Sequence, residues 1–245
     1  MMIDKIDCLN ERSMRTIEQI QKILSGQFPT ARVKDIQEIP DRLENPKFYG
    51  YQTSVLAARN NNNEVCGFAI LLNFTQPHFS WLEYIAVAPG LNGTGIGSEL
   101  YHQAQCETLK SEQKAIFFEC CVDDAELIDN LITLSQNRAR MKFYEKHGAR
   151  PILHNDYPKP AFPGDQDLYY LMYDSLGKCE APDKQLTQAV VARIMKLRYS
   201  DLYSDSAIRE LCESFIDDPA ILRSPQYDRI TFSHVWKKPS EQLWL

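Results

Sequence analysis

Three glycines, Gly93, Gly95 and Gly97, alternate with other residues in the middle of the chain. The apolar residues over 96–104 recur four residues apart and predict a helix that begins at these glycines. Glycine has no side chain, so a ligand can approach the backbone N–H groups closely, and a helix N-terminus favours negative charge. The segment is therefore typical of a phosphate-binding site. A turn that only requires left-handed backbone angles is the alternative.

Two familiar phosphate-binding motifs fit this segment poorly. In a Rossmann unit the first glycine follows a strand directly, and an acid lies about twenty residues further on, a position that Glu119 imitates. Here residues 88–92 separate the glycines from the preceding strand, and two hairpin strands come earlier. A P-loop requires Gly-Lys-Ser/Thr, whereas this loop ends in Gly97-Ser98 without a lysine. Dinucleotide binding and triphosphate hydrolysis are both disfavoured.

The elements that precede the glycines form a helical region followed by a β-rich region. Apolar spacing behind Ser13 predicts an N-terminal helix with Ser13 as its cap, and a second helical stretch is interrupted by Pro40. A hairpin joined by a run of asparagines and one further strand follow. The expected helices are 13–24 and 33–43, and the expected strands are 53–58, 65–74 and 81–88.

A buried strand, a helix and two closing strands are expected after the glycines, and a change in composition near residue 178 predicts a boundary there. We expect one domain over 1–178 and a helical C-terminal extension over 179–245. The expected strands are 115–122, 152–154 and 168–173, and the expected helices are 136–147, 183–199 and 205–215. The first C-terminal helix has an apolar stripe, which predicts that it packs back on the domain or forms a dimer contact. Its basic residues, Lys184, Arg193, Lys196 and Arg198, are interpreted as a solvated face.

The composition limits the class of protein. The chain has 245 residues, of which 44% are hydrophobic, so it can bury a sizeable core. Its net charge of −6 disfavours nucleic-acid binding. The seven cysteines have no metal-binding spacing and are interpreted as reduced thiols of a cytoplasmic protein without a bound metal. No apolar run approaches the roughly 18 residues of a membrane span.

Two segments together resemble motifs of the GNAT superfamily of N-acetyltransferases. Residues 87–97, Val-Ala-Pro-Gly-Leu-Asn-Gly-Thr-Gly-Ile-Gly, resemble its pyrophosphate motif, Q/R-x-x-G-x-G/A, with Asn92 where Gln or Arg is usual. Residues 137–148 are similar to its second motif, in which an Asn precedes a Phe-Tyr pair and a Gly. The resemblance covers roughly residues 1–175. It implies the GNAT fold, a mixed α/β (α+β) architecture with a central sheet of six to seven strands flanked by helices.

The resemblance also implies acetyl-CoA as the cofactor and assigns its binding residues. Backbone groups of the strand before the glycines would hold the pantetheine arm where two strands splay apart, and the glycine loop would hold the diphosphate. The implied cofactor-binding residues are Ile85, Ala86, Val87, Asn92, Gly93, Thr94, Gly95, Ile96, Gly97, Ser98, Asn137 and Tyr144. A role as a helix N-cap is the alternative for Asn137.

Acetyl transfer to an amine requires a base, because an alkylamine is protonated at neutral pH. Glu83 is the first candidate, since strand alternation predicts that it shares a face with Trp81, Ile85 and Val87. Glu119 on the neighbouring strand is the second. The alternative for Glu83 is a solvated surface position. The alternative for Glu119 is a carboxylate hydrogen-bonded inside the sheet.

The resemblance makes Tyr144 the acid that protonates the departing thiolate, and a position in an aromatic core is its alternative. Cys120 and Cys121 lie on a buried strand, where thiols are usually inert, so we expect direct transfer without an acyl-enzyme.

The acceptor is expected to be a small-molecule amine. Its pocket is predicted from Phe48 and Tyr49, the loop 157–167 and the acidic residues Asp123, Asp124, Glu126 and Asp129. These carboxylates and the net charge favour a small cationic amine or a polyamine. A non-catalytic acyl-CoA-binding sensor or scaffold is the alternative function. A fainter resemblance, over 117–120, 143–151, 170–174 and 215–219, is to an acetyltransferase module fused to bacterial histone-deacetylase-like domains.

Overall fold

Seven strands form a single mixed sheet in the order β1-β2-β3-β4-β5-β7-β6. The computed structural model describes residues 1–6, 8–157 and 168–227. Among the described strands β4 and β5 pair in parallel, and every other neighbouring pair is antiparallel. The strands are β1 (Met2–Ile6), β2 (Gln52–Arg59), β3 (Val65–Thr75), β4 (His78–Val87), β5 (Ile116–Cys121), β6 (Arg150–Pro151) and β7 (Tyr169–Asp174). The predicted mixed sheet of six to seven strands is confirmed.

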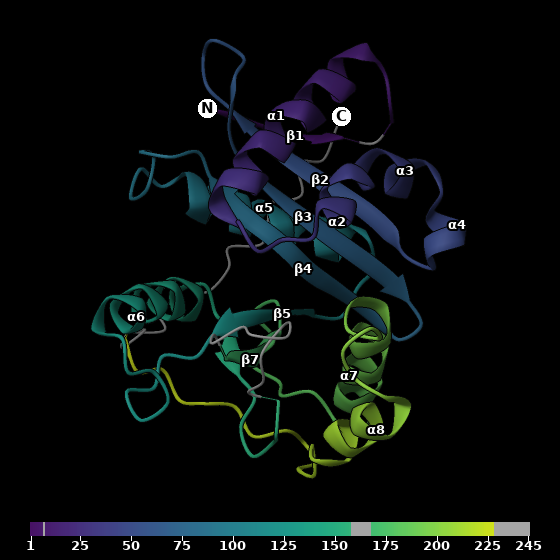
Figure 1. Ribbon diagram of the computed structural model, residues 1–245, viewed down its shortest axis with the longest axis vertical. Helices are drawn as coiled ribbons and strands as arrows, with labels where there is room; N and C mark the ends of the chain where they lie inside the picture. The colour runs from purple at the N-terminus through teal and green to yellow at the C-terminus, as the bar shows by residue number, and fades with distance from the viewer. Residues whose placement is uncertain (7, 158–167, 228–245) are drawn as a thin grey trace, which may run out of the picture.

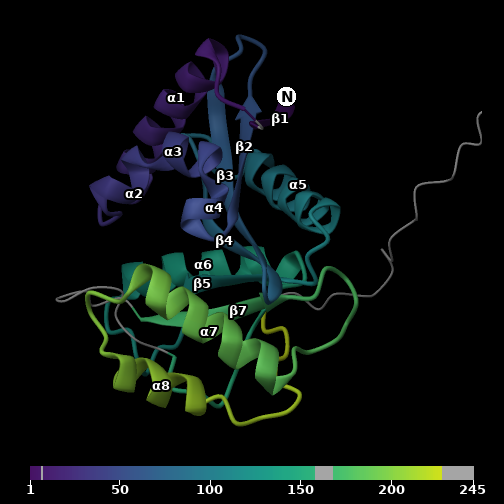
Figure 2. The same cartoon turned by 90° about the vertical axis from the view of Figure 1, so that its right-hand side faces the viewer.

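Helices cover both faces of this sheet, and each face has its own apolar cluster. Buried residues of α1 and α7 share one cluster with β2, β3 and β4, and residues of α5 and α6 belong to the other. Figure 2 shows α1 and α5 on opposite sides of β1–β4. We call the two sides the α1–α7 face and the α5–α6 face. The helices are α1 (Glu11–Gln27), α2 (Val33–Gln37), α3 (Ile39–Glu44), α4 (Pro46–Tyr49), α5 (Ile96–Lys110), α6 (Leu131–Lys146), α7 (Lys184–Arg198) and α8 (Asp205–Glu213).

Capping residues explain where the helices begin and correct two predicted starts. Asn10 caps α1 by accepting a hydrogen bond from the Ser13 N–H, and the Ser13 hydroxyl accepts one from the Asn10 N–H in return. Ser13 is therefore the third helical residue and not the cap. Asn130 caps α6, so this helix begins before the predicted residue 136. Pro40 divides the second helical stretch into α2 and α3, as predicted.

Two strands differ from the prediction. Strand β1, which pairs with β2 at the edge of the sheet, was not predicted. The strand expected over 152–154 lies earlier, as β6 at Arg150–Pro151, and Ile152 adds one hydrogen bond from its N–H to the Leu171 carbonyl of β7. Ile152 also forms an isolated bridge with Leu222 near the end of the described chain.

Strands β4 and β5 diverge soon after they meet. They pair only at Ser80 with Ile116 and at Trp81 with Phe117, although both strands continue beyond this point. In the same region β4 contains a bulge, since Leu82 lies opposite Leu71 and Tyr84 opposite Ile70, which leaves Glu83 as the extra residue. Figure 1 shows the sheet divided into an upper part with β1–β4 and a lower part with β5 and β7.

The C-terminal extension packs against the sheet. Val190, Val191 and Ile194 of α7 are buried in the same cluster as the strands, which confirms that the apolar stripe packs back on the domain. The basic face is not simply solvated, because Arg193 donates a hydrogen bond to the Gly50 carbonyl at 3.1 Å. The dimer contact and the boundary near residue 178 stay predictions. No described helix combines the length and the apolar composition that crossing a membrane requires.

Replacement of a buried side chain of α7 tests this packing. We expect Ile194→Ala to lower the free energy of unfolding by about 2–5 kcal/mol, because it removes apolar contacts from a fully buried position. Ile216→Ala is the matched control, since Ile216 is 64% exposed and its loss should change stability by less than about 0.5 kcal/mol. Urea unfolding measures both, and equal stability of the two variants would show that α7 lies outside the cooperative core.

Candidate active site

The glycine loop forms an uncapped helix N-terminus. Gly95 is the N-cap of α5 with φ +88°, and Gly93 has φ +78°, both in the left-handed region that favours glycine. The N–H groups in the first turn of any helix have no intrahelical acceptor. In α5 no side chain caps them either. A Cβ added at either glycine would meet no atom within 4 Å, so the approach to these donors is open. This arrangement fits the diphosphate of coenzyme A.

The side chains around the loop contribute little to this anion site. Asn92 and Thr94 are exposed, and the Thr94 hydroxyl donates to the Leu91 carbonyl. Ser98 lies 3.1 Å from His147 Nε2, a contact that the sequence did not predict. Burial lowers the pKa of His147, which favours a neutral imidazole near neutral pH. Phosphate binding at this loop therefore depends on backbone donors.

The backbone of β4 offers unpaired groups where β5 diverges. The Ala88 N–H donates to the Cys66 carbonyl on β3. Because main-chain groups alternate in direction along a strand, those of Ala86 point toward β3, and those of Ile85 and Val87 point toward the divergence. Of the three predicted backbone positions, Ile85 and Val87 therefore suit the pantetheine arm, and the Ala86 groups are directed to the ladder.

The bulge changes which side chains share a face. Trp81 and Tyr84 both belong to the cluster of the α1–α7 face, whereas Ile85 packs against the cluster of the α5–α6 face. Glu83 lies with Trp81 on the α1–α7 face, because it contacts α3 and α7 there. The prediction that Glu83, Trp81 and Ile85 share one face is thus wrong for Ile85, since strict alternation fails at an inserted residue.

Glu83 is a buried carboxylate held by two arginines. Its side chain is 4% exposed, Oε2 lies 2.5 Å from Arg42 Nη2 and Oε1 lies 2.7 Å from Arg198 Nη1. Burial opposes the charge of Arg198, but Glu83 together with the nearby Tyr84, Tyr199 and Glu119 outweighs it and raises the pKa of Arg198 above its usual value. Both carboxylate oxygens are thus engaged by guanidinium donors, so Glu83 is not the solvated surface group of the alternative interpretation.

Glu119 lies on the neighbouring strand and is held by two phenols. Tyr157 donates to Oε1 at 2.8 Å and Tyr199 donates to Oε2 at 2.5 Å. All three belong to the α1–α7 face, where Phe117 of β5 and both tyrosines join the same cluster. Burial and the adjacent Glu119 raise the pKa of Tyr157 and of Tyr199, so both phenols carry their protons. Tyr157 was predicted only as part of the acceptor loop 157–167 and Tyr199 not as a site residue, because nothing in the local sequence links either to β5.

Tyr144 lies on the opposite face. Its ring is 4.5 Å from that of Phe118 and 5.6 Å from that of Tyr101, measured between centroids. Its hydroxyl makes no hydrogen bond within the described part of the chain. Burial raises the pKa of Tyr144 above its usual range, which keeps this phenol protonated. Burial also raises the pKa of the neighbouring Cys120 thiol, and a protonated thiol is a poor nucleophile.

Asn137 lies in the interior of α6, not at its start. Its side-chain amide donates to the Val122 carbonyl at 2.8 Å, and only 1% of the residue is exposed. Arg140 donates in turn to the Asn137 side-chain oxygen at 3.1 Å. The N-cap alternative for Asn137 is wrong, because Asn130 fills that position. Asn137 instead fixes the first residue after β5 against α6.

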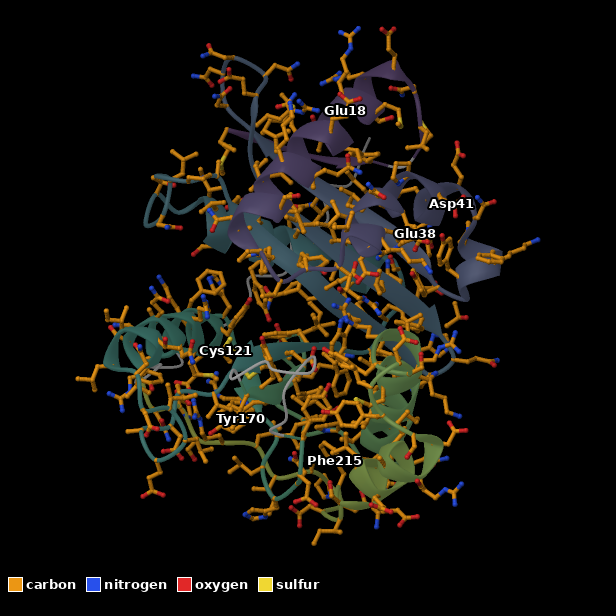
Figure 3. The ribbon with its side chains drawn as sticks, viewed as in Figure 1. Glu18, Glu38, Asp41, Cys121, Tyr170 and Phe215 are labelled. Atoms are coloured by element: carbon orange, nitrogen blue, oxygen red, sulfur yellow. The ribbon has the colours of Figure 1, made fainter. Side chains whose placement is uncertain are left out.

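The predicted acceptor residues lie in different environments. Asp123 is buried and forms a two-bond ion pair with Arg223, at 2.7 and 3.0 Å, which leaves it unsuited to bind a cation. Phe48 is 83% exposed, and Tyr49 donates to Asp41, which Figure 3 labels beside α4. Asp124, Glu126 and Asp129 lie on the connection between β5 and α6. Residues 158–167 of the predicted loop lie outside the described residues.

Comparisons with known proteins agree with this geometry. Residues 51–148 match the acetyltransferase (GNAT) domain family. The fold is similar to an aminoglycoside 6'-N-acetyltransferase solved with coenzyme A, with 18% identity and a TM-score of 0.55 over 75% of this chain and 100% of that chain. The enzyme of the same description from Enterococcus faecium gives 16% identity and a TM-score of 0.53, over 75% of this chain and 100% of that one. An aminoglycoside 6'-acetyltransferase type Ii gives 20% identity and a TM-score of 0.51, over 72% of this chain and 97% of that one. None of the curated protein sequences matches the chain.

Residues 51–148 therefore match a GNAT acetyltransferase domain, and the diverging strands and the uncapped glycine loop agree with that match. This confirms the predicted fold, family, enzyme class and cofactor. The likeness to modules fused to histone-deacetylase-like domains stays a prediction. The assignment of individual site residues is a proposal that the geometry makes testable.

A pair of substitutions at Gly95 tests the anion site. Asp and Asn have the same shape and both tolerate left-handed backbone angles, so they differ mainly in charge. We expect Gly95→Asp to weaken coenzyme A binding at least about tenfold more than Gly95→Asn, because a carboxylate at the helix N-terminus repels the diphosphate. Isothermal calorimetry measures the affinities. Equal affinities of the two variants for coenzyme A would place the diphosphate elsewhere.

Proposed function

We propose that this protein transfers the acetyl group of acetyl-CoA directly to a primary amine of a small molecule, with Glu119 as the base and Tyr144 as the acid. One observation carries the proposal. Successive residues of β5 lie on opposite faces, so Glu119 joins the α1–α7 face and Phe118, against which Tyr144 packs, joins the α5–α6 face. Proton removal and proton delivery are thus assigned to opposite sides of the divergence between β4 and β5.

The cofactor side is supported by the backbone and by Tyr144. Bound acetyl-CoA supplies the acetyl group and departs as a thiol. The first turn of α5 would bind its diphosphate, and the outward main-chain groups of Ile85 and Val87 would hold the arm. The protonated Tyr144 phenol has no competing hydrogen bond within the described part of the chain, so its proton is available to the sulfur.

The acceptor side favours Glu119 over Glu83 as the base. Both oxygens of Glu83 are engaged by guanidinium groups, so an amine proton could reach Glu83 only after an ion pair breaks. The oxygens of Glu119 accept hydrogen bonds from phenols, whose hydroxyl groups can both donate and accept a proton. We therefore assign Glu83 to holding α3 and α7 at β4, and Glu119 to removal of the proton from the amine.

We propose a small-molecule amine as the acceptor of the acetyl group and, more specifically, a cationic amine or a polyamine. Asp123 no longer supports a polyamine, because Arg223 already neutralises it. A panel of polyamines, amino acids, aminoglycosides and lysine peptides, with release of free thiol as the signal, tests the activity. Coenzyme A binding without thiol release for any of these amines would favour the sensor alternative.

Removal of the Tyr144 hydroxyl tests the acid. We expect Tyr144→Phe to lower kcat about 100-fold or more and to leave the KM for acetyl-CoA nearly unchanged, because Phe keeps the ring contacts and loses only the proton. The raised pKa of Tyr144 means that its proton is lost only in strongly alkaline solution. The kcat of the wild type should therefore not fall between pH 7 and about 9.5 through loss of this proton. A kcat of Tyr144→Phe equal to that of the wild type would refute the assignment.

Neutral isosteres of the two glutamates identify the base. We expect Glu119→Gln to lower kcat about 100-fold or more with the melting temperature little changed, because an amide cannot accept the amine proton. Glu83→Gln should destabilise the protein by about 3 kcal/mol or more, because it leaves two buried guanidinium charges without their partner. Steady-state kinetics and thermal unfolding of both variants make the comparison. If Glu83→Gln had a low kcat and wild-type stability while Glu119→Gln kept its activity, Glu83 and not Glu119 would be the base.

A further inference from the structure

The last residues of the C-terminal helix reach both strands of the divergence. Arg198 ends α7 and binds Glu83 on β4, and the adjacent Tyr199 binds Glu119 on β5. These strands pair no further than Trp81 and Phe117, so two consecutive residues of the extension connect strands that no longer pair. This connection places the Tyr199 phenol on the same face as the proposed base.

We propose that Tyr199 is a catalytic residue that carries the proton of the acceptor amine to Glu119, and that Arg198 positions it. This inference rests on the proposed function and adds a residue from the C-terminal extension to the site. Both oxygens of Glu119 accept hydrogen bonds from phenols, so a proton bound for either oxygen can pass through a phenol. A phenol oxygen that donates one hydrogen bond still has lone pairs that accept another.

The transfer balances without any further reactant. The bond between the ammonium nitrogen and its proton breaks, and the proton moves to the Tyr199 oxygen while the original Tyr199 proton moves to Glu119 Oε2. The nitrogen keeps its electron pair and becomes a nucleophile, Glu119 becomes neutral, and Tyr199 regains its starting form. Glu119 returns its proton to water after the acetylated product has left.

Tyr199 suits this role better than Tyr157 for a reason of position. Tyr157 packs against Phe215, with ring centroids 6.1 Å apart. Tyr199 instead follows Arg198, whose guanidinium lies 5.8 Å above the Tyr84 ring of β4. Tyr199 thus directly follows a residue that contacts β4 where β4 and β5 separate. The groups that face or surround its phenol are Glu119, Arg198, Tyr157 and Tyr203.

Two phenylalanine variants separate a relay from a purely structural role. Tyr199→Phe and Tyr157→Phe each remove one phenol bond from Glu119. With the best acceptor of the amine panel, we expect Tyr199→Phe to lower kcat about 100-fold at pH 7 and Tyr157→Phe to lower it less than about tenfold. The deficit of Tyr199→Phe should shrink as the pH rises toward the pKa of the acceptor, since the free amine then forms in solution. Tyr227→Phe, which removes a phenol bond from Asp123, is the matched control and should keep the wild-type kcat.

A double variant tests whether Tyr199 and Glu119 act as one unit. We expect Tyr199→Phe with Glu119→Gln to be as slow as Glu119→Gln alone, since both changes interrupt one relay. Coenzyme A affinity, measured by calorimetry, should equal that of the wild type in both single variants.

Several outcomes would overturn the relay. Equal losses and parallel pH profiles for Tyr199→Phe and Tyr157→Phe would show that the phenols only hold Glu119. A kcat of Tyr199→Phe within threefold of the wild type, or losses that multiply in the double variant, would do the same. In each of these cases the wild type still acetylates an amine, so the proposed function survives. A wild type that acetylates none of the amines would overturn both proposals.

Discussion

The site depends on the early end of hydrogen bonding between β4 and β5. The two strands pair at only two positions and then separate, so their facing backbone groups are left to other partners. The bulge at Glu83 lies at this point and bends β4 away from β5. Because the separated edge lies next to the uncapped N-terminus of α5, a long ligand can bind its anionic part at the helix and its arm along the strand. The fold thus determines where the thioester lies before any side chain acts.

The sheet also separates the chemistry into two environments. On the α5–α6 face, aromatic rings pack around the partly buried Tyr144, and its raised pKa keeps the phenol protonated. On the α1–α7 face, buried charges and phenols alternate from α3 through β4 and α7 to β5. The proposed acid and the proposed base thereby lie on opposite faces of the sheet. Burial raises the pKa of the Cys120 thiol, which agrees with the proposed direct transfer.

The parts of the site that could be predicted from the sequence are those whose residues lie close together along the chain. Gly93 to Ser98 and the Phe143-Tyr144 pair form local motifs, so their spacing was informative. The partners of Glu83 could not be found in this way, because Arg42 and Arg198 are 41 and 115 residues away. The bulge could not be predicted from the sequence either. Glu83 between Leu82 and Tyr84 fits the alternation of a regular strand, so nothing indicates an inserted residue. Tyr199 has no motif at all, and only packing of α7 brings it to β5.

The ion pairs of Glu83 determine conformation more than they add stability. Removal of two arginines and a carboxylate from water costs several kcal/mol per ion, and their attraction offsets much of this cost without exceeding it by a large amount. What the arrangement does provide is a strong penalty for any other position of α7, because a displaced Arg198 would leave Glu83 with one partner fewer in a buried site. Apolar contacts of Ile194 and its neighbours supply the affinity of α7 for the sheet, and the buried charges fix its register. A helix held in one register is what allows Tyr199, the residue after its end, to lie within hydrogen-bond distance of Glu119 on a separate strand.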